Sequence, residues 1–261
     1  MKKPWRNKLF HALLLMILSV GAVSAEEIVM VFGGGYPPFY TPDLNTGMYI
    51  DFLKRFEERH PAFSIQKVQL PRVRMDAWMK TGKAHAFSLN SIMFIPEPLR
   101  DNFCFSDPIW ETTDHVIMRK GDTFCFQNPE DLFGRQVGVI LGNGYGQYDP
   151  LMASGKITAF RVASTPQLYQ MLLTRRIDAC FGNIHADPPT MEANHFALDR
   201  FVFSRHPLLS FELVCQIQNT HAHFQKTLNR FIQTSRATGY LKALEDRYSH
   251  TRYLTFDNCM E

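Results

Sequence analysis

The sequence has little that would let it span a membrane or perform covalent catalysis. After residue 25, no run approaches the roughly 18 apolar residues that suggest a membrane helix. The chain contains no GxSxG or HExxH motif, no CxxC pair and no cysteine in a nucleophile context. We therefore expect no catalytic residue, no metal and no cofactor, and we look for a protein that binds its ligand without transforming it.

The first 25 residues have the pattern of a cleavable export signal. Four basic residues precede the apolar run Leu9–Val20, which at about a dozen residues is short for a bilayer span. Val23-Ser24-Ala25 then supplies the small residues of a cleavage site before Glu26. Because no cysteine stands at that site, a lipid anchor is not expected. We predict a protein that is exported to the periplasm and is mature from Glu26.

The chain also lacks an excess of either charge once this leader is set aside. The whole sequence has 28 Lys and Arg against 25 Asp and Glu, and the leader holds four of the basic residues and none of the acidic ones. The remainder is therefore close to neutral. This balance gives no electrostatic reason to expect a nucleic acid or an anionic membrane as partner.

Cysteines are few and odd in number, which leaves at least one unpaired in an oxidising compartment. The five are Cys104, Cys125, Cys180, Cys215 and Cys259. Cys180 and Cys215 lie in strand-like runs and are expected to be buried. We predict a disulfide between Cys104 and Cys125.

Strand-like and helix-like segments alternate along the mature chain, which indicates an α/β fold with largely parallel sheets. A strand, a glycine-rich turn, a helix and a second strand occur from Ile28 and again from Val137. This predicts two lobes of similar build. Ligands bind at the carboxyl ends of strands in open α/β sheets, so two such edges would form a cleft.

The glycine-rich turn in "VFGGGYPPFYTP" cannot present a helix N-terminus to a phosphate. Two prolines, which lack an N–H group, follow the glycines, and no helix is expected before Met48. The prolines instead stiffen a loop that carries Tyr36, Phe39 and Tyr40. We predict that these rings form a platform for a ligand. The alternative is that they pack on the core of their own lobe.

A second glycine-rich loop, "GVILGNGYGQYDP", frees the backbone at Gly142, Gly144 and Gly146. Successive N–H groups there would form a nest for an anion such as a carboxylate. The alternative is a plain turn, because Asn-Gly is a strong turn signal.

Taken in order, these segments resemble the bacterial extracytoplasmic solute-binding proteins of family 3, which supply polar amino acids and related solutes to ABC importers. The resemblance covers essentially the whole mature chain. It rests on "YPPF", "GMYIDF", "AWMKTGKAHAF", "LRDNFCFSDP", "GRQVGVILGN", "LLTRRIDACFGN" and "GYLKALEDRY". It implies a two-lobe type II periplasmic binding-protein fold, with mixed sheets flanked by helices and a ligand cleft between the lobes.

The resemblance also implies which residues contact the ligand. An aromatic residue at Tyr36 stacks on it, residues after the "HAFSL" strand bond to it, and Arg100 grips its carboxylate. Arg72 and Arg74 are a second candidate for that clamp, since an arginine fork suits a carboxylate. Our candidate ligand-binding residues are Tyr36, Phe39, Tyr40, Arg74, Asn90, Ser91, Arg100, Asn143, Gly144, Tyr145 and Asn183.

Four departures from the family pattern leave the ligand class open, one of which is that Asn143 and Gly144 replace the usual hydroxyl residues of the second loop. Asn183 stands where an acidic residue takes the α-ammonium group, and His85 stands where aspartate is usual. The segment before Arg100 is also a few residues longer than the pattern. An amino acid-like solute, a carboxylate, a neutral polar solute and the absence of any ligand all remain open.

The resemblance divides the mature chain into two lobes. We expect residues 26–110 and 214–261 in lobe 1 and 111–213 in lobe 2, with hinge strands near Ile109–Thr113 and Ser210–Leu213. The expected protein is a monomer that passes a small polar solute to an ABC permease. The alternatives are a sensor for a membrane regulator and a dehydratase, whose general acid would be Glu111, Asp114 or Asp187.

Overall fold

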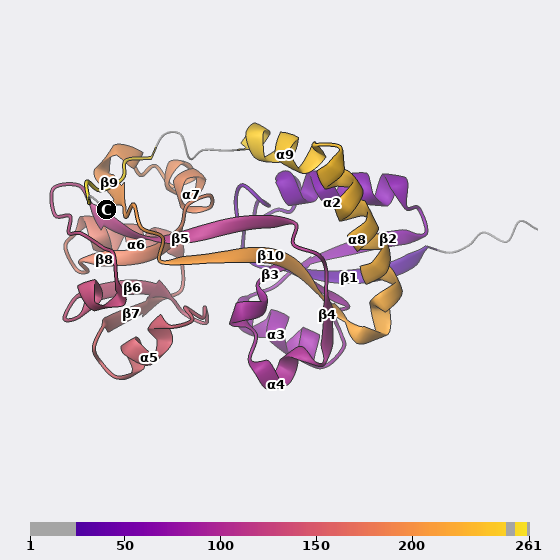
Figure 1. Cartoon of the computed structure of the whole chain (residues 1–261), viewed down its shortest axis with the longest axis horizontal. Helices are drawn as coiled ribbons and strands as arrows, with labels where there is room; N and C mark the ends of the chain where they lie inside the picture. Colours follow the sequence, from indigo (N-terminus) through magenta and orange to yellow (C-terminus); the bar gives the residue numbers. More distant parts are fainter. Residues whose placement is uncertain (1–24, 249–253, 260–261) are drawn as a thin grey trace, which may run out of the picture.

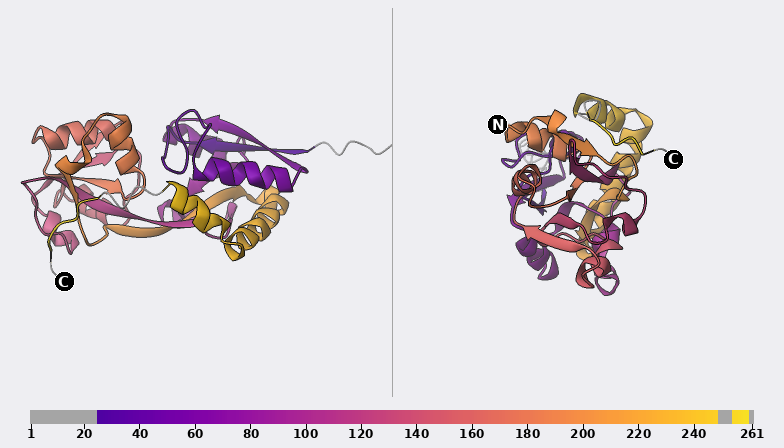
Figure 2. Two further views of the ribbon diagram at one scale, coloured as in Figure 1. Left: turned by 90° about the horizontal axis from the view of Figure 1, so that it is seen from above. Right: turned by 90° about the vertical axis from the view of Figure 1, so that its left-hand side faces the viewer.

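The structure is a computed structural model that describes residues 25–248 and 254–259. The predicted leader, apart from Ala25, lies outside the described residues. The chain forms two lobes side by side, joined by two long strands (Figures 1 and 2). One continuous sheet, in the order β2-β1-β3-β10-β5-β8-β6-β7, passes through both lobes. The predicted fold class, mixed sheets flanked by helices in two lobes, is confirmed.

Lobe 1 is built on the parallel strands β1 (Glu26–Phe32), β2 (Phe63–Gln69) and β3 (Ala86–Asn90). Helix α2 (Met48–Arg59) forms because Tyr49, Phe52, Leu53 and Phe56 recur at helical spacing, and all four are fully buried. The remaining elements of this lobe are α3 (Arg72–Lys80), η1 (Ile92–Phe94), α4 (Glu97–Arg100), β4 (Phe103–Phe105), η4 (Asn219–His221), α8 (Ala222–Ala237) and α9 (Tyr240–Tyr248).

Lobe 2 repeats the parallel arrangement with β6 (Gln136–Ile140) between β7 (Thr158–Val162) and β8 (Ala179–Asn183). The predicted recurrence of a strand, a glycine-rich turn, a helix and a strand is therefore present in both lobes. The other elements here are η2 (Pro129–Leu132), α5 (Tyr148–Ala153), α6 (Thr165–Leu173), α7 (Asp187–Ala193), η3 (Leu198–Arg200) and β9 (Phe201–Phe203). Each lobe has its own hydrophobic core.

The connection between the lobes is an antiparallel ribbon of β5 (Trp110–Arg119) and β10 (Leu209–Gln218). Trp110 pairs with Leu213 at its lobe 1 end, and Asp114 pairs with Leu209 at its lobe 2 end. The predicted hinge segments lie in this ribbon. Side chains alternate between the two faces of a strand, so every second residue of the ribbon faces the same way.

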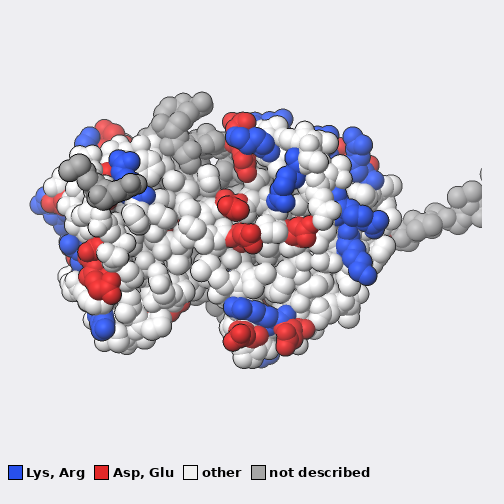
Figure 3. Space-filling view, viewed as in Figure 1, with Lys and Arg blue, Asp and Glu red and all other residues white. Residues whose placement is uncertain are grey.

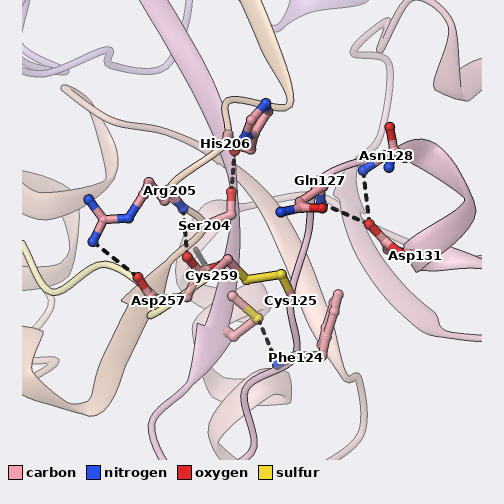
Figure 4. Close-up of a disulfide and its surroundings, with 11 residues drawn as sticks. Phe124, Cys125, Gln127, Asn128, Asp131, Ser204, Arg205, His206, Asp257 and Cys259 are labelled. Carbon is pink, nitrogen blue, oxygen red and sulfur yellow. Dashed lines mark hydrogen bonds between the residues drawn. A yellow bond between two sulfur atoms is a disulfide. The ribbon is translucent and has the colours of Figure 1, made fainter. Parts of the chain in front are cut away.

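The predicted disulfide between Cys104 and Cys125 is wrong. Cys125 pairs with Cys259, with 5.4 Å between their Cα atoms, and Cys104 is free (Figure 4). Cys104 lies in β4 of lobe 1, whereas Cys125 follows β5 in lobe 2, so the two are on different lobes. Cys180 and Cys215 are buried and free, as expected.

The C-terminal segment explains how Cys259 reaches Cys125. After α9 in lobe 1, residues 254–259 lie against β9 of lobe 2, where the Phe203 amide donates to the Thr255 carbonyl at 2.9 Å. Asp257 is buried there and accepts from the backbone N–H of Arg205 (Figure 4). The sequence division assigned these last residues to lobe 1. Of the helices in the described part of the chain, none has the length and apolar content to cross a bilayer.

Candidate functional site

The candidate site lies where the two lobes meet over the ribbon. One face of the ribbon carries Trp110, Thr112 and Asp114 from β5 and Leu209, Phe211 and Leu213 from β10. Trp110 packs on Phe39 of lobe 1 with ring centroids 5.8 Å apart, and Phe211 packs on Phe94 of η1 at 5.1 Å. This face is therefore the floor on which elements of both lobes converge.

The opposite face of the ribbon is polar and acidic. Glu111 and Glu212 are directly paired across it, and Thr113 and Ser210 are their neighbours. A cavity of about 330 Å³ is lined by these four residues together with Thr112 and Phe211 of the floor. Acidic side chains are visible over the crossing strands in Figure 3, which also shows the surface hollowed between the lobes at its lower edge.

A second cavity, of about 280 Å³, lies beside the floor between lobe 1, α9 and lobe 2. His185, which precedes α7, lines both cavities and lies edge-on to Phe39 with ring centroids 6.4 Å apart. His185 was not predicted as a site residue. His185 is placed at the site by the turn between β8 and α7, and no local sequence pattern predicts where that turn lies. Burial lowers the pKa of His185, so its ring is favoured in the neutral form.

The aromatic loop forms the wall of the site on lobe 1, and its three rings have different surroundings. Phe39 and Tyr40 are buried in the core of lobe 1, as the alternative interpretation proposed. Tyr36 is only half-buried and lies over Phe39, with ring centroids 4.7 Å apart. Burial raises the pKa of Tyr36, and the negative charges of Asp114 and Asp187 raise it further. Two of the three rings are therefore near lobe 2: Phe39 contacts His185, and Tyr36 is close enough to Asp114 and Asp187 for their charges to act on its hydroxyl.

The backbone holds this aromatic loop in place. Tyr36 and Tyr40 exchange backbone hydrogen bonds of 2.9 and 3.0 Å, and the amides of Met48 and Tyr49 donate to the carbonyls of Pro38 and Phe39. Gly47 makes the return turn with φ of +129°, and a Cβ atom there would lie 2.4 Å from the Phe39 carbonyl oxygen. Glycine is therefore needed at this close approach.

On lobe 2 the wall is a network centred on Asn183, at the end of β8. Its Nδ2 donates to Asp114 Oδ1 at 2.8 Å and to Thr112 Oγ1 at 2.9 Å, and its backbone N–H donates to Asp187. Its Oδ1 accepts from the backbone N–H of His185 at 3.1 Å. Asn183 itself cannot carry a negative charge. It donates hydrogen bonds to two ionisable carboxyl groups, those of Asp114 and Asp187.

Asp114 and Asp187 differ in how much of each carboxyl group is already used. Asp187 is buried, and its two oxygens accept from the Tyr169 hydroxyl and the Asn183 amide. Asp114 is half-buried, and only its Oδ1 accepts a hydrogen bond from the described residues. Burial raises the pKa of Asp114 to about 6 and that of Asp187 to about 7. Desolvation disfavours the charged form of both groups.

The second glycine-rich loop is differently placed from the aromatic one. Tyr145 points into the core of lobe 2, where its hydroxyl accepts from the Ile140 amide at 2.9 Å. The Tyr145 backbone N–H, a donor that a nest would need, donates to Asp149 at 2.8 Å. Asn143 and Gly144 are exposed, and a Cβ atom on Gly144 would lie 3.7 Å from the ring of Phe94 in lobe 1. This loop therefore meets lobe 1 through η1.

The candidate arginines form their hydrogen bonds and ion pairs within lobe 1. Arg100 Nε donates to the Ile95 carbonyl at 3.0 Å, and Arg74 is exposed on α3. Arg72 is paired with Asp76 at 3.2 Å and lies over the Phe87 ring. A carboxylate clamp at Arg100 or at Arg72 and Arg74 stays a prediction.

The residues after β3 are also engaged in internal contacts. Asn90 donates to the Gln216 side chain at 2.8 Å and accepts from the Ser91 amide, and both residues are buried. Their predicted contact with a ligand stays a prediction. Across the described ranges, no group of three or more His, Cys, Asp or Glu side chains could hold a metal ion.

Comparison with known protein families matches residues 28–251 to the bacterial extracellular solute-binding proteins, family 3. The chain belongs to this family. A solute-binding protein of two lobes fits the arrangement described above, in which an aromatic wall and a polar wall face each other over a shared ribbon. No curated protein matches the sequence significantly.

Solved structures with the same fold are numerous, and the three that follow are less than 20% identical to this chain. The solute-binding protein resembles a mutant of the arginine-binding protein ArgBP from T. maritima, with a TM-score of 0.70, 19% identity, and coverage of 85% of this chain and 94% of that one. It also resembles the GluR0 ligand-binding core in complex with L-glutamate, with a TM-score of 0.72, 14% identity, and coverage of 88% and 100%. An ancestral arginine-binding protein bound to arginine gives a TM-score of 0.69, 17% identity, and coverage of 85% and 97%.

Proposed function

We propose that this protein captures a small polar solute of the amino acid type between its two lobes in the periplasm and delivers it to an ABC importer. The observation that carries the proposal is the meeting of two different walls over the ribbon. Phe39 of lobe 1 lies edge-on to His185 of lobe 2, and the charges of Asp114 and Asp187 of lobe 2 reach the hydroxyl of Tyr36. Apolar surface with a few oriented polar groups is the usual composition of a small-molecule site.

The ribbon gives this site a means of closing. Two strands are the main connection between lobes whose cores are separate, so bending the ribbon moves one wall against the other. Capture by closure needs no covalent chemistry. The predicted export signal would place the mature chain in the periplasm, where the Cys125–Cys259 disulfide can form.

A thermal-shift screen of residues 26–261 against amino acids, amines, dicarboxylates, sugars and small peptides tests the proposal. A ligand present at 100 times its Kd should stabilise the protein by about 2.7 kcal/mol, which is roughly 5–10 °C in Tm for a chain of this size. The variant Tyr36→Ala should keep its own Tm and lose most of the ligand-induced shift. A panel without any hit, or an unchanged shift in Tyr36→Ala, would count against the proposed site.

The same capture step would serve a membrane sensor as well as an importer. The importer role is tested by reconstituting a permease encoded beside this protein and measuring solute uptake with and without the protein. Stimulation of uptake supports the importer, whereas stimulation of a neighbouring receptor kinase without uptake supports the sensor.

A further inference from the structure

Asp114 is the only ionisable residue on the floor of the site. The two strands pair directly from Trp110 with Leu213 to Asp114 with Leu209, which assigns six residues to that face. Four of them, Trp110, Leu209, Phe211 and Leu213, are apolar, and Thr112 is engaged with Asn183. The acidic residues Glu111 and Glu212 lie on the opposite face, because strand side chains alternate. The floor therefore presents one carboxyl group within an apolar surface.

The carboxyl group of Asp114 is held in one orientation and has one oxygen to spare. Its Oδ1 accepts from Asn183 Nδ2 at 2.8 Å, and Asn183 is itself fixed by Thr112 and by the amides of His185 and Ala186. Asp114 Oδ2 accepts no hydrogen bond within the described ranges and is not among the buried polar atoms that lack a partner. That oxygen therefore has no hydrogen-bond partner among the described residues and is not completely sealed from solvent.

No lysine or arginine of the described chain neutralises this carboxyl group. The ion pairs formed by described residues include neither Asp114 nor Asp187. The surroundings of Asp114 act on its pKa through burial and the Asn183 hydrogen bond, without a cationic side chain. Asp187, joined to the same asparagine, adds a second acidic group close by. A half-buried carboxylate of this kind is stabilised by a partner of opposite charge.

We propose that the solute is an organic cation whose ammonium or guanidinium group binds Asp114 Oδ2 while its apolar part lies between the floor and Tyr36. This inference rests on the proposed function and specifies which end of the solute is recognised. In the family pattern, the acidic residue that binds the ammonium group stands at the end of β8, where this chain has Asn183. Here the acidic residue would be Asp114, on the neighbouring strand β5. The ring of Tyr36 suits a cation, because the face of an aromatic ring attracts positive charge.

The inference predicts that the cationic group of a solute is required and that a carboxylate is not. Isothermal titration of the mature protein with three matched groups of probes separates these requirements. The first group is lysine, arginine and phenylalanine; the second is the amines without a carboxylate, cadaverine, agmatine and phenethylamine; the third is the acids without an amine, hexanoate and 3-phenylpropanoate. We expect binding in the second group and none in the third.

The variant Asp114→Asn tests the residue itself. Its amide oxygen can still accept from Asn183, so the wall should persist, and cation affinity should fall by about 10- to 100-fold. Asp199→Asn removes the same charge from the exposed turn η3 of lobe 2 and should change affinity less than twofold. The two Tm values without ligand confirm that both variants fold.

Each other outcome identifies what has failed. Binding of the acids, or cation binding that Asp114→Asn leaves unchanged, would overturn this inference and leave the solute-binding function intact. An absence of binding in all three groups, together with an empty wider screen, would remove the proposed function as well. Equal losses in Asp114→Asn and Asp199→Asn would mean that only the overall negative charge matters, which also overturns the inference.

Discussion

The two walls of the site are held in place by different kinds of interaction. The aromatic wall depends on backbone geometry, because Gly47 lies against Phe39 and the loop exchanges main-chain hydrogen bonds with itself and with α2. The polar wall depends on side chains. Asn183, at the end of β8, donates hydrogen bonds to Asp114 of β5 and to Asp187 of α7, and so holds these elements together. The first kind of wall is insensitive to pH and intolerant of added atoms. The second responds to protonation, because the pKa values of both its carboxyl groups are raised by burial.

The largest effect that this comparison predicts follows from Gly47→Ala. The new Cβ atom would lie within 2.7 Å of three main-chain atoms of Phe39 and Tyr40, at a backbone angle that alanine rarely adopts. We expect a loss of about 3 kcal/mol or more in the free energy of unfolding, since main-chain atoms cannot move aside cheaply. Urea denaturation measures it. Gly34→Ala is the matched control, because nothing lies within 4 Å of its Cβ and it should be nearly neutral.

The next largest effect is expected from Asp187→Ala in the polar wall. The substitution leaves the buried Tyr169 hydroxyl and the Asn183 amide without their acceptor. Unpaired buried donors of this kind cost about 1–3 kcal/mol each, and the loss of a buried carboxylate's desolvation penalty offsets part of that. We expect a net loss of about 2 kcal/mol by urea denaturation at pH 7. If the variant is instead more stable, the desolvation penalty of the Asp187 carboxyl group exceeds the stabilisation from its hydrogen bonds.

How far the sequence predicts these walls depends on whether the information is local. The burial of Phe52 and Phe56 follows from helical spacing, and the loop that carries Tyr36 follows from its glycines and prolines. The role of Asp114 does not follow from any local pattern. The face of the ribbon on which it lies is decided by the pairing of β5 with β10, which is nearly 100 residues away in the chain. The packing of Tyr145 in the core of lobe 2 is likewise not evident from its loop sequence, and its contact with a ligand stays a prediction.

The disulfide shows the same limit in a stronger form. Cys259 is 134 residues from Cys125, and their pairing depends on the path of the C-terminal segment across to lobe 2. Cys104, the predicted partner, is only 21 positions away but lies on the other lobe. Contacts between the lobes depend on the path of the whole chain, so the sequence pattern of a single segment cannot predict them.

A smaller effect is expected from Thr112→Val, which keeps the side-chain shape and removes the hydroxyl group. Thr112 Oγ1 accepts from Asn183 Nδ2 at 2.9 Å, and both residues are buried. Asn183 keeps its bond to Asp114, so we expect a loss of about 1 kcal/mol in thermal or urea unfolding. The matched change in the aromatic wall is Tyr40→Phe. It should cost less, because the Gly33 amide that it frees is half-exposed and can donate to water.

The smallest effect concerns pH and distinguishes the walls most directly. Burial raises the pKa of Asp114 to about 6, above its usual range near 4, so the folded protein binds a proton there more readily than the unfolded chain. Its contribution to stability is therefore fully present below about pH 4 and is lost as pH rises through about 6. Asp187 acts in the same direction up to about pH 7, whereas His115 and His185, with pKa values lowered by burial, act in the opposite direction.

Comparison of Asp114→Asn with the unaltered protein isolates the one group from these others. The variant should gain about 0.5–1 kcal/mol relative to the unaltered protein between pH 5 and pH 8, a modest value because Asp114 is half-exposed. Tm measured at four pH values in the same salt gives the difference. A bound cation should remove it, since the cation favours the ionised carboxylate. An identical pH dependence in the two proteins would show that Asp114 is as well solvated in the folded protein as in the unfolded chain, and the contrast between the two walls would then rest on Asp187 alone.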